Sequence, residues 1–456
     1  MATHDTPPPD LTEGDVNASP RRAAFTARHS RRTRDWLDRD AAVFLHQSLS
    51  TPCLDVLAGC DGSRLRDLDG REFLDFHGNS VHQVGFSRPE VVAAITDQLR
   101  ALSFSPRRFT NIPAITLAER LAGLAPEPLG KVLFAPAGTL AVGMALKIAR
   151  VATGRFKTVS MWDAFHGASL DAVSVGGEAL FRRGMGPLLP GTEHVPPPDP
   201  SRCVLAPPGG GCDGCGLRCA AYLEYVLEKE GDVAAVVAEP FRCTTVNIPP
   251  PGYWERVRRA CDRHGTLLVF DETALCLGRA GSFFAFERFH VVPDMVVLGK
   301  GLGGGILPLA AVLVRRDLDV AGHLALGHYT HEKNPVACAA ALAAIDIVLG
   351  DDLPGRAREL GRYAAARLRT MALRRPSVRA VRAMGLSLAV DLDAADTADA
   401  VLHACLERGL SFKVSRGDCL TLTPPLTITQ DDLDAALAIL DAALCLASDR
   451  QEGVEP

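Results

Sequence analysis

The chain has 456 residues, of which 47% are hydrophobic and 23% are charged, and its formal net charge at pH 7 is −5. This length exceeds one ordinary hydrophobic core, so we expect two domains of unequal size. The slightly acidic balance excludes an electrostatic case for binding nucleic acid or an anionic membrane. No apolar stretch is long enough to span a bilayer, and the N-terminus lacks the apolar core of a signal peptide. Thirteen cysteines without an export signal therefore indicate reduced thiols in a cytoplasm.

The pattern of apolar residues divides the chain into four segments. Residues 1–30 are rich in Pro, Asp, Thr and Arg without an apolar period, which is typical of a mobile arm. Residues 31–75 carry short strand signals. Between 76 and 345, apolar strands alternate with amphipathic helices, which predicts a large α/β domain with a mostly parallel sheet. Residues 346–456 mix helices with short strands, which predicts a smaller α+β domain.

Lys300 and Asp271 stand at the ends of two apolar runs. Asp271 follows the run 266–270 and Lys300 follows 295–299, and both runs indicate buried strands. Open α/β sheets bind ligands at such strand ends. Pyridoxal phosphate chemistry needs a lysine for the Schiff base and an acid that keeps the pyridine nitrogen protonated. Each signal alone is weak, because a strand-terminal Asp is more often a cap, and glycines after a lysine usually mark a turn.

A series of motifs in a fixed order strengthens this interpretation. The series resembles the class III aminotransferases among the fold-type I pyridoxal phosphate enzymes, from about Gly59 to the C-terminus. The resemblance implies pyridoxal 5′-phosphate as cofactor, a large cofactor-binding domain over 76–345, and a small domain that also takes in 31–75. The motifs are Glu239-Pro240, Gly252-Tyr-Trp254, Cys261-Asp-Arg-His-Gly265, Asp271-Glu272, Gly278-Arg-Ala-Gly281, Pro293-Asp294 and Gly299-Lys-Gly-Leu-Gly-Gly-Gly305.

A phosphate-binding segment is predicted where the run 132–134 meets the helix expected over 140–149. Backbone amides at a helix N-terminus can hold a phosphate group. The resemblance places the family's Ser-Gly-Ser/Thr phosphate loop here, so Gly138 and Thr139 match while Ala137 departs.

The resemblance assigns further contacts with the cofactor. Phe165 and His166 match an aromatic-His-Gly motif whose ring stacks on pyridoxal, although Phe165 alone would be interpreted as a core aromatic residue. Glu239 is placed at the cofactor site. Thr330 matches a threonine that reaches the phosphate bound by the partner subunit, which implies a homodimer with shared active sites.

Several positions depart from the ordinary transaminase pattern. The family usually carries acidic residues in the helix after the phosphate loop, whereas this chain has Leu140 and Gly143. Ala274 stands where a Gln near the cofactor's phenolic oxygen is usual, and Cys276 replaces a common Gly. These departures suggest a chain that has moved away from amino-group exchange while keeping Lys300 and Asp271.

A narrower resemblance points to the 1-hydroxy-2-aminoethylphosphonate ammonia-lyase branch of the family. It implies a lyase that eliminates ammonia from (R)-1-hydroxy-2-aminoethylphosphonate and gives phosphonoacetaldehyde. A class III transaminase, a phosphoethanolamine-type phospholyase and a non-catalytic pyridoxal-binding protein stay open as alternatives. The motifs are His46-Gln-Ser-Leu-Ser-Thr-Pro-Cys53, Asp75-Phe-His-Gly-Asn79, Val81-His-Gln-Val-Gly85, Ser105-Pro-Arg-Arg-Phe-Thr-Asn111, Met161-Trp-Asp163 and His328-Tyr-Thr-His-Glu-Lys333.

A lyase of this kind needs a proton donor for the leaving group and cations for the phosphonate. Lys300 is the first candidate for the donor, with His82 or His166 as alternatives. Paired arginines suit tetrahedral oxyanions through bidentate forks, so Arg107 and Arg108 are the substrate candidates. A solvated loop explains this pair equally well. Lys413 and Arg416 are weaker candidates.

Four cysteines follow one another in a Pro/Gly-rich insertion, with the pattern C-x8-C-x2-C-x3-C. A tetrahedral zinc ion needs four such ligands and would stabilise a loop that lacks its own core. The spacing is irregular, so a loop of reduced cysteines is preferred over a structural metal. The residues are Cys203, Cys212, Cys215 and Cys219.

Overall fold

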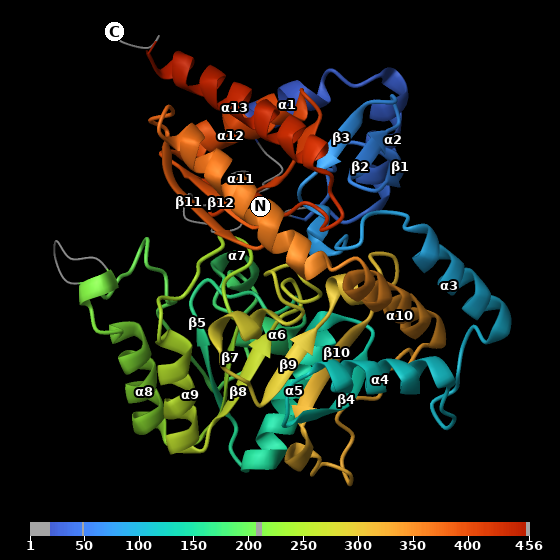
Figure 1. Cartoon of the computed structure of the whole chain (residues 1–456), viewed down its shortest axis with the longest axis vertical. Helices are drawn as coiled ribbons and strands as arrows, with labels where there is room; N and C mark the ends of the chain where they lie inside the picture. The colour runs from blue at the N-terminus through green and yellow to red at the C-terminus, as the bar shows by residue number, and fades with distance from the viewer. Residues whose placement is uncertain (1–18, 48–49, 207–211, 453–456) are drawn as a thin grey trace. The chain divides into compact units, whose positions relative to one another are not determined.

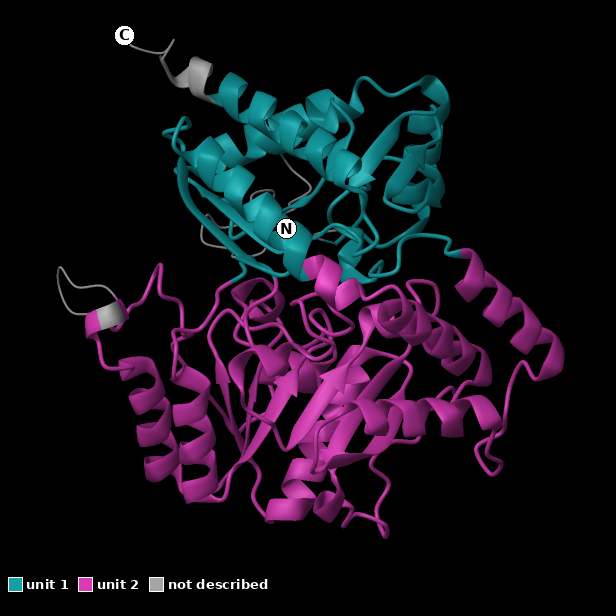
Figure 2. Ribbon diagram, viewed as in Figure 1, with its two compact units in different colours: residues 1–88, 244–246, 358–456 teal, residues 89–243, 247–357 magenta. Residues whose placement is uncertain are grey.

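The computed structural model describes residues 19–47, 50–206 and 212–452. The chain forms two compact units, which are shown in different colours in Figure 2. Unit 1 comprises the chain up to Arg88, Thr244–Val246 and the chain from Arg358 onward; unit 2 comprises Pro89–Cys243 and Asn247–Ala357. The borders of these units differ from the predicted borders at 75/76 and 345/346, and the short segment of unit 1 after Cys243 was not anticipated.

Unit 2 is built on a seven-stranded sheet with the order β4-β10-β9-β8-β7-β5-β6. The strands from β9 to β6 run parallel to their neighbours, whereas β10 is antiparallel to both β4 and β9. The mostly parallel sheet of the sequence prediction is thus confirmed. The strands are β4 (Leu129–Ala135), β5 (Lys157–Met161), β6 (Thr192–Val195), β7 (Val233–Ala238), β8 (Leu267–Asp271), β9 (Met295–Leu298) and β10 (Ala310–Arg315).

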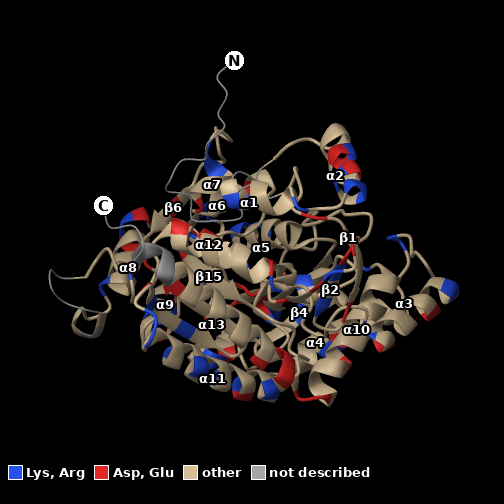
Figure 3. Cartoon of the chain, turned by 90° about the horizontal axis from the view of Figure 1, so that it is seen from above, with Lys and Arg blue, Asp and Glu red and all other residues tan. Residues whose placement is uncertain are grey.

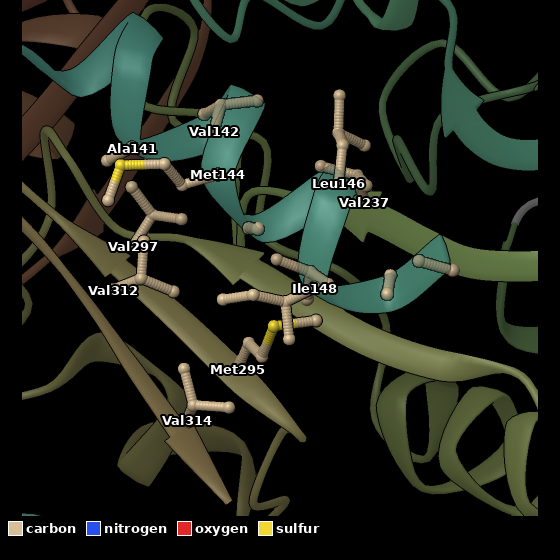
Figure 4. Close-up of a cluster of buried hydrophobic side chains, with 14 of the residues drawn as sticks. Ala141, Val142, Met144, Leu146, Ile148, Val237, Met295, Val297, Val312 and Val314 are labelled. Atoms are coloured by element: carbon tan, nitrogen blue, oxygen red, sulfur yellow. The ribbon is translucent and has the colours of Figure 1, made fainter. Parts of the chain in front are cut away.

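The central strands of this sheet are buried along their whole length. Every residue of β7, β8 and β9 is buried, which explains why these strands read as continuous apolar runs rather than alternating ones. Helix α5 (Gly138–Thr153) lies against the sheet, and its Met144 and Ile148 pack among Val297 and Val312 (Figure 4). This packing gives rigid support to the residues that follow the strands.

Helices of unit 2 surround the sheet, and Figure 1 shows α8 and α9 side by side. Helix α10 packs against α3 and α4. The helices are α3 (Pro89–Ala101), α4 (Ile112–Leu124), α5, α6 (Leu170–Val175), α7 (Ala179–Arg182), α8 (Arg218–Glu230), α9 (Tyr253–His264) and α10 (Pro335–Gly350), with 3-10 turns η2 (Cys212–Gly214), η3 (Ala285–Phe289), η4 (Lys300–Gly303) and η5 (Arg316–Leu318).

Unit 1 has two four-stranded sheets, with the orders β1-β2-β3-β13 and β11-β12-β15-β14. Helix α11 (Leu353–Ala372) begins in unit 2 and continues into unit 1. The other elements are α1 (Pro20–Thr26), α2 (Arg31–Val43), β1 (Leu57–Asp61), β2 (Arg64–Asp67), β3 (Glu72–Asp75), η1 (Gly78–Ser80), β11 (Val378–Met384), β12 (Ser387–Leu392), α12 (Ala395–Leu406), β13 (Leu410–Ser411), β14 (Lys413–Ser415), β15 (Cys419–Leu422) and α13 (Gln430–Glu452).

The segment predicted as a mobile arm is partly ordered. Residues 1–18 lie outside the described residues, but the chain from Pro20 to Thr26 forms α1, so the prediction differs from the structure there. The Ser19 side chain accepts a hydrogen bond from Arg22 N and caps this helix. Phe25 is buried against Phe73 and Leu406, which lie far away in the sequence. A single apolar residue gave no periodic signal, yet it anchors the helix.

Charged residues of both signs occur together on helix α2. Acidic and basic side chains are interspersed along α2 (Figure 3), which is typical of a solvated helix face. Over the described part of the chain, no helix combines the length and the apolar character that a bilayer crossing requires.

Trp254 links the core of unit 2 to the turn after β7. Its side chain is fully buried, its ring meets Phe270 edge-on at 4.6 Å, and its Nε1–H donates to Pro240 O at 2.7 Å. We expect Trp254→Phe to leave that carbonyl unsatisfied and to lower the free energy of unfolding by about 1–3 kcal/mol. Calorimetry of the cofactor-loaded protein measures the effect. Trp36→Phe, at an exposed site on α2, is the control, and equal melting of both variants would contradict the assignment.

Candidate active site

Asp271 and Lys300 leave the sheet at the same edge, because β8 and β9 are parallel neighbours. Asp271 pairs in register with Val297, and Glu272 N donates to Val297 O at 2.9 Å. Lys300 begins the turn η4 directly after β9 and is half-buried. Its φ of 47° lies in the left-handed region, where a residue with a side chain is strained. Such strain is characteristic of functional sites, where the surrounding structure holds the residue in place.

Asp271 is a buried carboxylate with defined hydrogen-bond partners. Oδ2 lies 2.9 Å from His166 Nδ1, and Oδ1 accepts hydrogen bonds from Thr273 N at 3.0 Å and from the Thr273 hydroxyl. Burial alone would raise the pKa of Asp271, but the hydrogen bond and charge of His166, with the bonds from Thr273, outweigh it and lower the pKa. Asp271 therefore stays ionised at neutral pH in a place where a cationic partner is favoured.

His166 is the hydrogen-bond partner of Asp271 Oδ2. Its side chain is fully buried, and its second nitrogen, Nε2, lies 3.4 Å from Ser160 Oγ. Nδ1–H donates to Asp271, and Nε2 accepts from the Ser160 hydroxyl when the ring is neutral and donates to it when the ring is protonated. Both ring nitrogens are thus engaged, which favours an orienting role over that of proton donor to a leaving group. The sequence motif predicted His166 near the cofactor but gave no sign of this contact with Asp271.

The predicted phosphate segment forms the start of α5. Ala137 is its N-cap in an extended conformation, and no side chain caps the helix, so backbone N–H groups of the first turn stay available for an anion. A Cβ on Gly138 would lie 3.0 Å from Thr273 Cγ2, so a larger residue would press against Thr273. Thr139 shares a hydrogen bond with Ser169. The arrangement suits a phosphate group, and the contact itself stays a prediction.

The remaining predicted contacts lie in separate segments of unit 2. Phe165 is half-buried and packs on Phe181 at a centroid distance of 4.2 Å. Glu239 follows β7 and accepts a hydrogen bond from Cys243 N at 3.0 Å. Thr330 is exposed in the loop before α10, as a residue that serves a partner subunit would be. These three assignments stay predictions.

Two thiols that sequence reasoning did not connect lie close enough to Lys300 to sense its charge. Burial raises the pKa of Cys276 to about 12, and Lys300 partly opposes this effect. Burial and the charge of Glu239 raise the pKa of Cys243 far above its ordinary value, and Lys300 again opposes them. Both thiols are therefore neutral and cannot act as bases. Cys276 donates weakly to Gly299 O, at 3.8 Å, next to Lys300.

The two arginines proposed for the substrate differ in their surroundings. Arg107 Nη1 lies 2.5 Å from His328 Nδ1, and its Nη2 lies 2.8 Å from Glu332 Oε1. This ion pair offsets much of the charge of Arg107. Arg108 is exposed, and the structure records no ion pair for it among the described residues. The contacts of Arg107 also bring its loop to the segment that carries Thr330.

The other candidates belong to unit 1. Arg416 is engaged with Asp391 at 3.3 Å and with Asp418 at 3.2 Å, so its charge is already compensated. Lys413 lies in β14. His82 is buried beside Asp75, with 3.7 Å between Nε2 and Oδ2.

Four cysteines lie in the insertion and at the start of α8. Cys215 N donates to Cys212 O in one turn, and burial, together with neighbouring thiols, raises the pKa of Cys212 to about 11. Among the described residues, no group of three or more His, Cys, Asp or Glu side chains is arranged to hold a metal ion. All thirteen cysteines are described, and each is unpaired. The hypothesis of a zinc ion on Cys203, Cys212, Cys215 and Cys219 stays a prediction.

The chain matches the aminotransferase class III family over residues 49–444. It is 43% identical over 453 residues to the (R)-1-hydroxy-2-aminoethylphosphonate ammonia-lyase of Vibrio splendidus, with 95% of each chain covered. It is 36% identical to the acetylornithine aminotransferase of Methanopyrus kandleri, covering 84% of this chain and 92% of that one. A pyridoxal phosphate-bound amine transaminase from an uncultivated Pseudomonas species superposes with a TM-score of 0.83 at 32% identity, covering 89% of this chain and 99% of that one.

The chain belongs to the class III aminotransferase family, and it is a fold-type I enzyme that depends on pyridoxal phosphate. The residues present fit that cofactor. An amine at Lys300, a buried ionised carboxylate at Asp271 and an uncapped helix N-terminus at Gly138 match its aldehyde, its pyridine nitrogen and its phosphate in chemistry. The sequence prediction of family, fold and cofactor is confirmed.

Removal of Lys300 tests the covalent link. Purified wild-type protein is expected to be yellow, and borohydride should attach the cofactor irreversibly to Lys300, which peptide mass spectrometry detects. Lys300→Ala should lose the covalent link and nearly all turnover, because no amine remains to bond the cofactor and to carry the proton. Lys147→Ala, on α5, is the control. A borohydride adduct on another lysine would overturn the assignment.

Replacement of Asp271 separates its electrostatic role from binding. Asp271→Asn should keep the fold and the link to Lys300, but a neutral amide cannot hold a proton on the pyridine nitrogen. Loss of one buried electrostatic partner of this kind typically lowers the rate by on the order of a hundredfold or more. Steady-state kinetics measures the effect, with Asp97→Asn at an exposed site on α3 as control. Near-normal turnover would exclude Asp271 from this role.

Proposed function

We propose that the chain is a lyase that eliminates ammonia from a 2-aminoethylphosphonate-type substrate. The substrate is (R)-1-hydroxy-2-aminoethylphosphonate and the product is phosphonoacetaldehyde. The observation that carries the proposal is the 43% identity to the Vibrio splendidus ammonia-lyase over nearly the full length of both chains. A class III transaminase is the second candidate, since a relative at 36% identity is an aminotransferase.

The bound cofactor supplies an electron sink that makes the carbon bearing the substrate nitrogen acidic. Lys300 accepts the proton of that carbon and carries it as an ammonium. Hydroxide leaves the adjacent carbon poorly unless it is protonated, and the Lys300 ammonium is the candidate donor. Water then converts the released product to aldehyde and ammonia. Asp271 stays ionised throughout, and His166 holds its orientation through the 2.9 Å hydrogen bond.

The departures from the ordinary transaminase pattern do not by themselves choose between elimination and transamination. Ala274 has no side-chain amide to offer to the site. It is buried, and it lies between Asp271 and Cys276 along the chain. The thiols of Cys243 and Cys276 stay neutral near Lys300. A site of this kind favours proton transfer by one group, which both elimination and transamination need, so the choice between them rests on the relatives.

The phosphonate requires cations, and the arginine loop is the candidate site. Arg108 is exposed and carries its charge without a recorded acid partner among the described residues, whereas Arg107 shares its charge with Glu332. We therefore assign the main electrostatic contact to Arg108 and an orienting contact to Arg107. The proximity of this loop to the segment of Thr330 suits a site completed by a second copy of the chain. A homodimer in the cytoplasm is part of this proposal.

An assay with and without a keto acid separates the candidate functions. The lyase should release ammonia and phosphonoacetaldehyde from the hydroxylated aminophosphonate without an acceptor. A transaminase would form product only with pyruvate or 2-oxoglutarate, and a phospholyase would release inorganic phosphate from phosphoethanolamine. Coupled ammonia detection and phosphorus NMR follow the three outcomes, and product that depends strictly on a keto acid would refute the lyase.

Substitution of the arginines tests the substrate class. Arg108→Ala should lower kcat/KM by roughly ten- to a hundredfold, because a charge-assisted hydrogen bond contributes about 1.5–3 kcal/mol. Arg108→Lys should restore only part of this, because lysine keeps the charge but not the planar fork. Arg107→Ala should have a smaller effect, since Glu332 already offsets its charge. Arg100→Ala on α3 is the control, and unchanged inhibition by methylphosphonate in both loop variants would place the anion elsewhere.

A further inference from the structure

The first turn of α5 is tied to the segment after β5 by a chain of three polar side chains. Thr139 Oγ1 lies 2.5 Å from Ser169 Oγ and accepts a hydrogen bond from Ser169 N at 3.1 Å. Ser169 Oγ donates to Asp171 Oδ1 at 2.5 Å, and Asp171 Oδ1 also accepts from Ala172 N at 3.0 Å. An ionised carboxylate therefore stands at one end of the chain and the phosphate segment at the other.

The direction of each hydrogen bond follows from the proton count. The Asp171 carboxylate can only accept, so the hydroxyl proton of Ser169 is directed to Asp171. Ser169 then has no proton left for Thr139, and the Thr139 hydroxyl must donate to Ser169. The single charge on Asp171 thus fixes the orientation of both hydroxyl groups. It leaves the backbone N–H groups, not the Thr139 O–H, to face an anion at the start of α5.

Two glycines make room for this arrangement. A Cβ on Gly143 would lie 2.3 Å from Asp171 Oδ2, so the carboxylate occupies the space that a side chain on α5 would fill. A Cβ on Gly167 would lie 2.3 Å from Thr139 Oγ1, and the φ of 129° at Gly167 is in the region that favours glycine. The segment of Phe165 and His166 therefore lies directly against the start of α5.

We propose that Asp171 is a positioning residue. Through Ser169, it holds the phosphate-binding start of α5 in a fixed position against the segment carrying Phe165 and His166. This inference deepens the proposed site, because it rests on the assignment of Gly138 and Thr139 to the cofactor phosphate. His166 contacts Asp271, and the neighbouring Gly167 lies against Thr139, so the segment that Asp171 helps to position touches both the start of α5 and Asp271. The charge of Asp171 also reaches Tyr329, beside Thr330, where burial together with this charge raises the pKa of the phenol.

Phosphorus NMR of the cofactor-loaded full-length protein tests the proposal, together with the rate of cofactor loss during dialysis. Asp171→Ala should shift the phosphorus signal and accelerate cofactor loss by roughly tenfold or more, because a charge-assisted hydrogen bond is removed. Asp171→Asn keeps an acceptor for Ser169 and should give an intermediate result. Glu119→Ala, which removes one negative charge from an exposed site on α4, should match the wild type. Circular dichroism melting establishes that each variant is folded.

A substitution at Gly143 provides a second, independent test of the position of the Asp171 carboxylate. Gly143→Ala should displace the carboxylate and reproduce the defect of Asp171→Ala. The double variant should be no worse than Asp171→Ala alone, because both changes break one interaction. Additive defects would contradict the packing argument.

A further variant separates failure of this inference from failure of the phosphate assignment. Gly138→Val should shift the phosphorus signal if the phosphate lies at the start of α5, because its side chain would press on Thr273 and displace the first turn of the helix. If Gly138→Val shifts the signal while Asp171→Ala leaves both the signal and the rate of cofactor loss unchanged, the role of Asp171 is refuted. If neither variant changes the signal, the phosphate assignment itself falls.

Discussion

The parallel pairing of β8 with β9 is the constraint on which the rest of the site depends. It places Asp271 and the residues before Lys300 at one edge of a sheet whose central strands are fully buried. A shift of one register step would move Asp271 to the opposite face of the sheet. The packing of α5 against these strands opposes such a shift, because Met144 and Ile148 occupy fixed positions in the core. The apolar core therefore fixes the positions of the site residues, although it contains none of the chemical groups of the site.

Electrostatic stabilisation of the site comes from one partner that is remote in sequence, His166, and from one neighbour, Thr273. Asp271 is buried, and an isolated buried carboxylate would be protonated rather than charged. His166 and Thr273 reverse this tendency, so the carboxylate stays ionised before any cofactor is bound. The thiols beside Lys300 behave in the opposite way, since burial keeps them neutral. One charged acceptor and one amine therefore stand beside thiols that carry no charge at neutral pH.

The sequence predicted those parts of the fold and site that are encoded locally. The apolar runs before Asp271 and Lys300 carry the strand signal within a few residues, and the start of α5 is marked by Gly138. The contact of His166 with Asp271 spans more than a hundred positions, and no local pattern announces it. Helix α1 was missed for the same reason, because Phe25 is anchored by residues from distant segments. The partner of Arg107, Glu332, also lies far along the chain, so its compensated charge could not be inferred.

The absence of an acidic residue at position 143 acquires a physical meaning in the structure. In the sequence, Gly143 stands in a helix where the class III aminotransferases usually carry acidic residues. In the structure, the carboxylate of Asp171 fills the space beside Gly143, so a negative group is still present near the start of this helix. Supplied from α6 instead of α5, that charge acts on Ser169 and Thr139 and reaches Tyr329. A negative group therefore stands beside α5 although the first turn of this helix carries no acidic residue of its own.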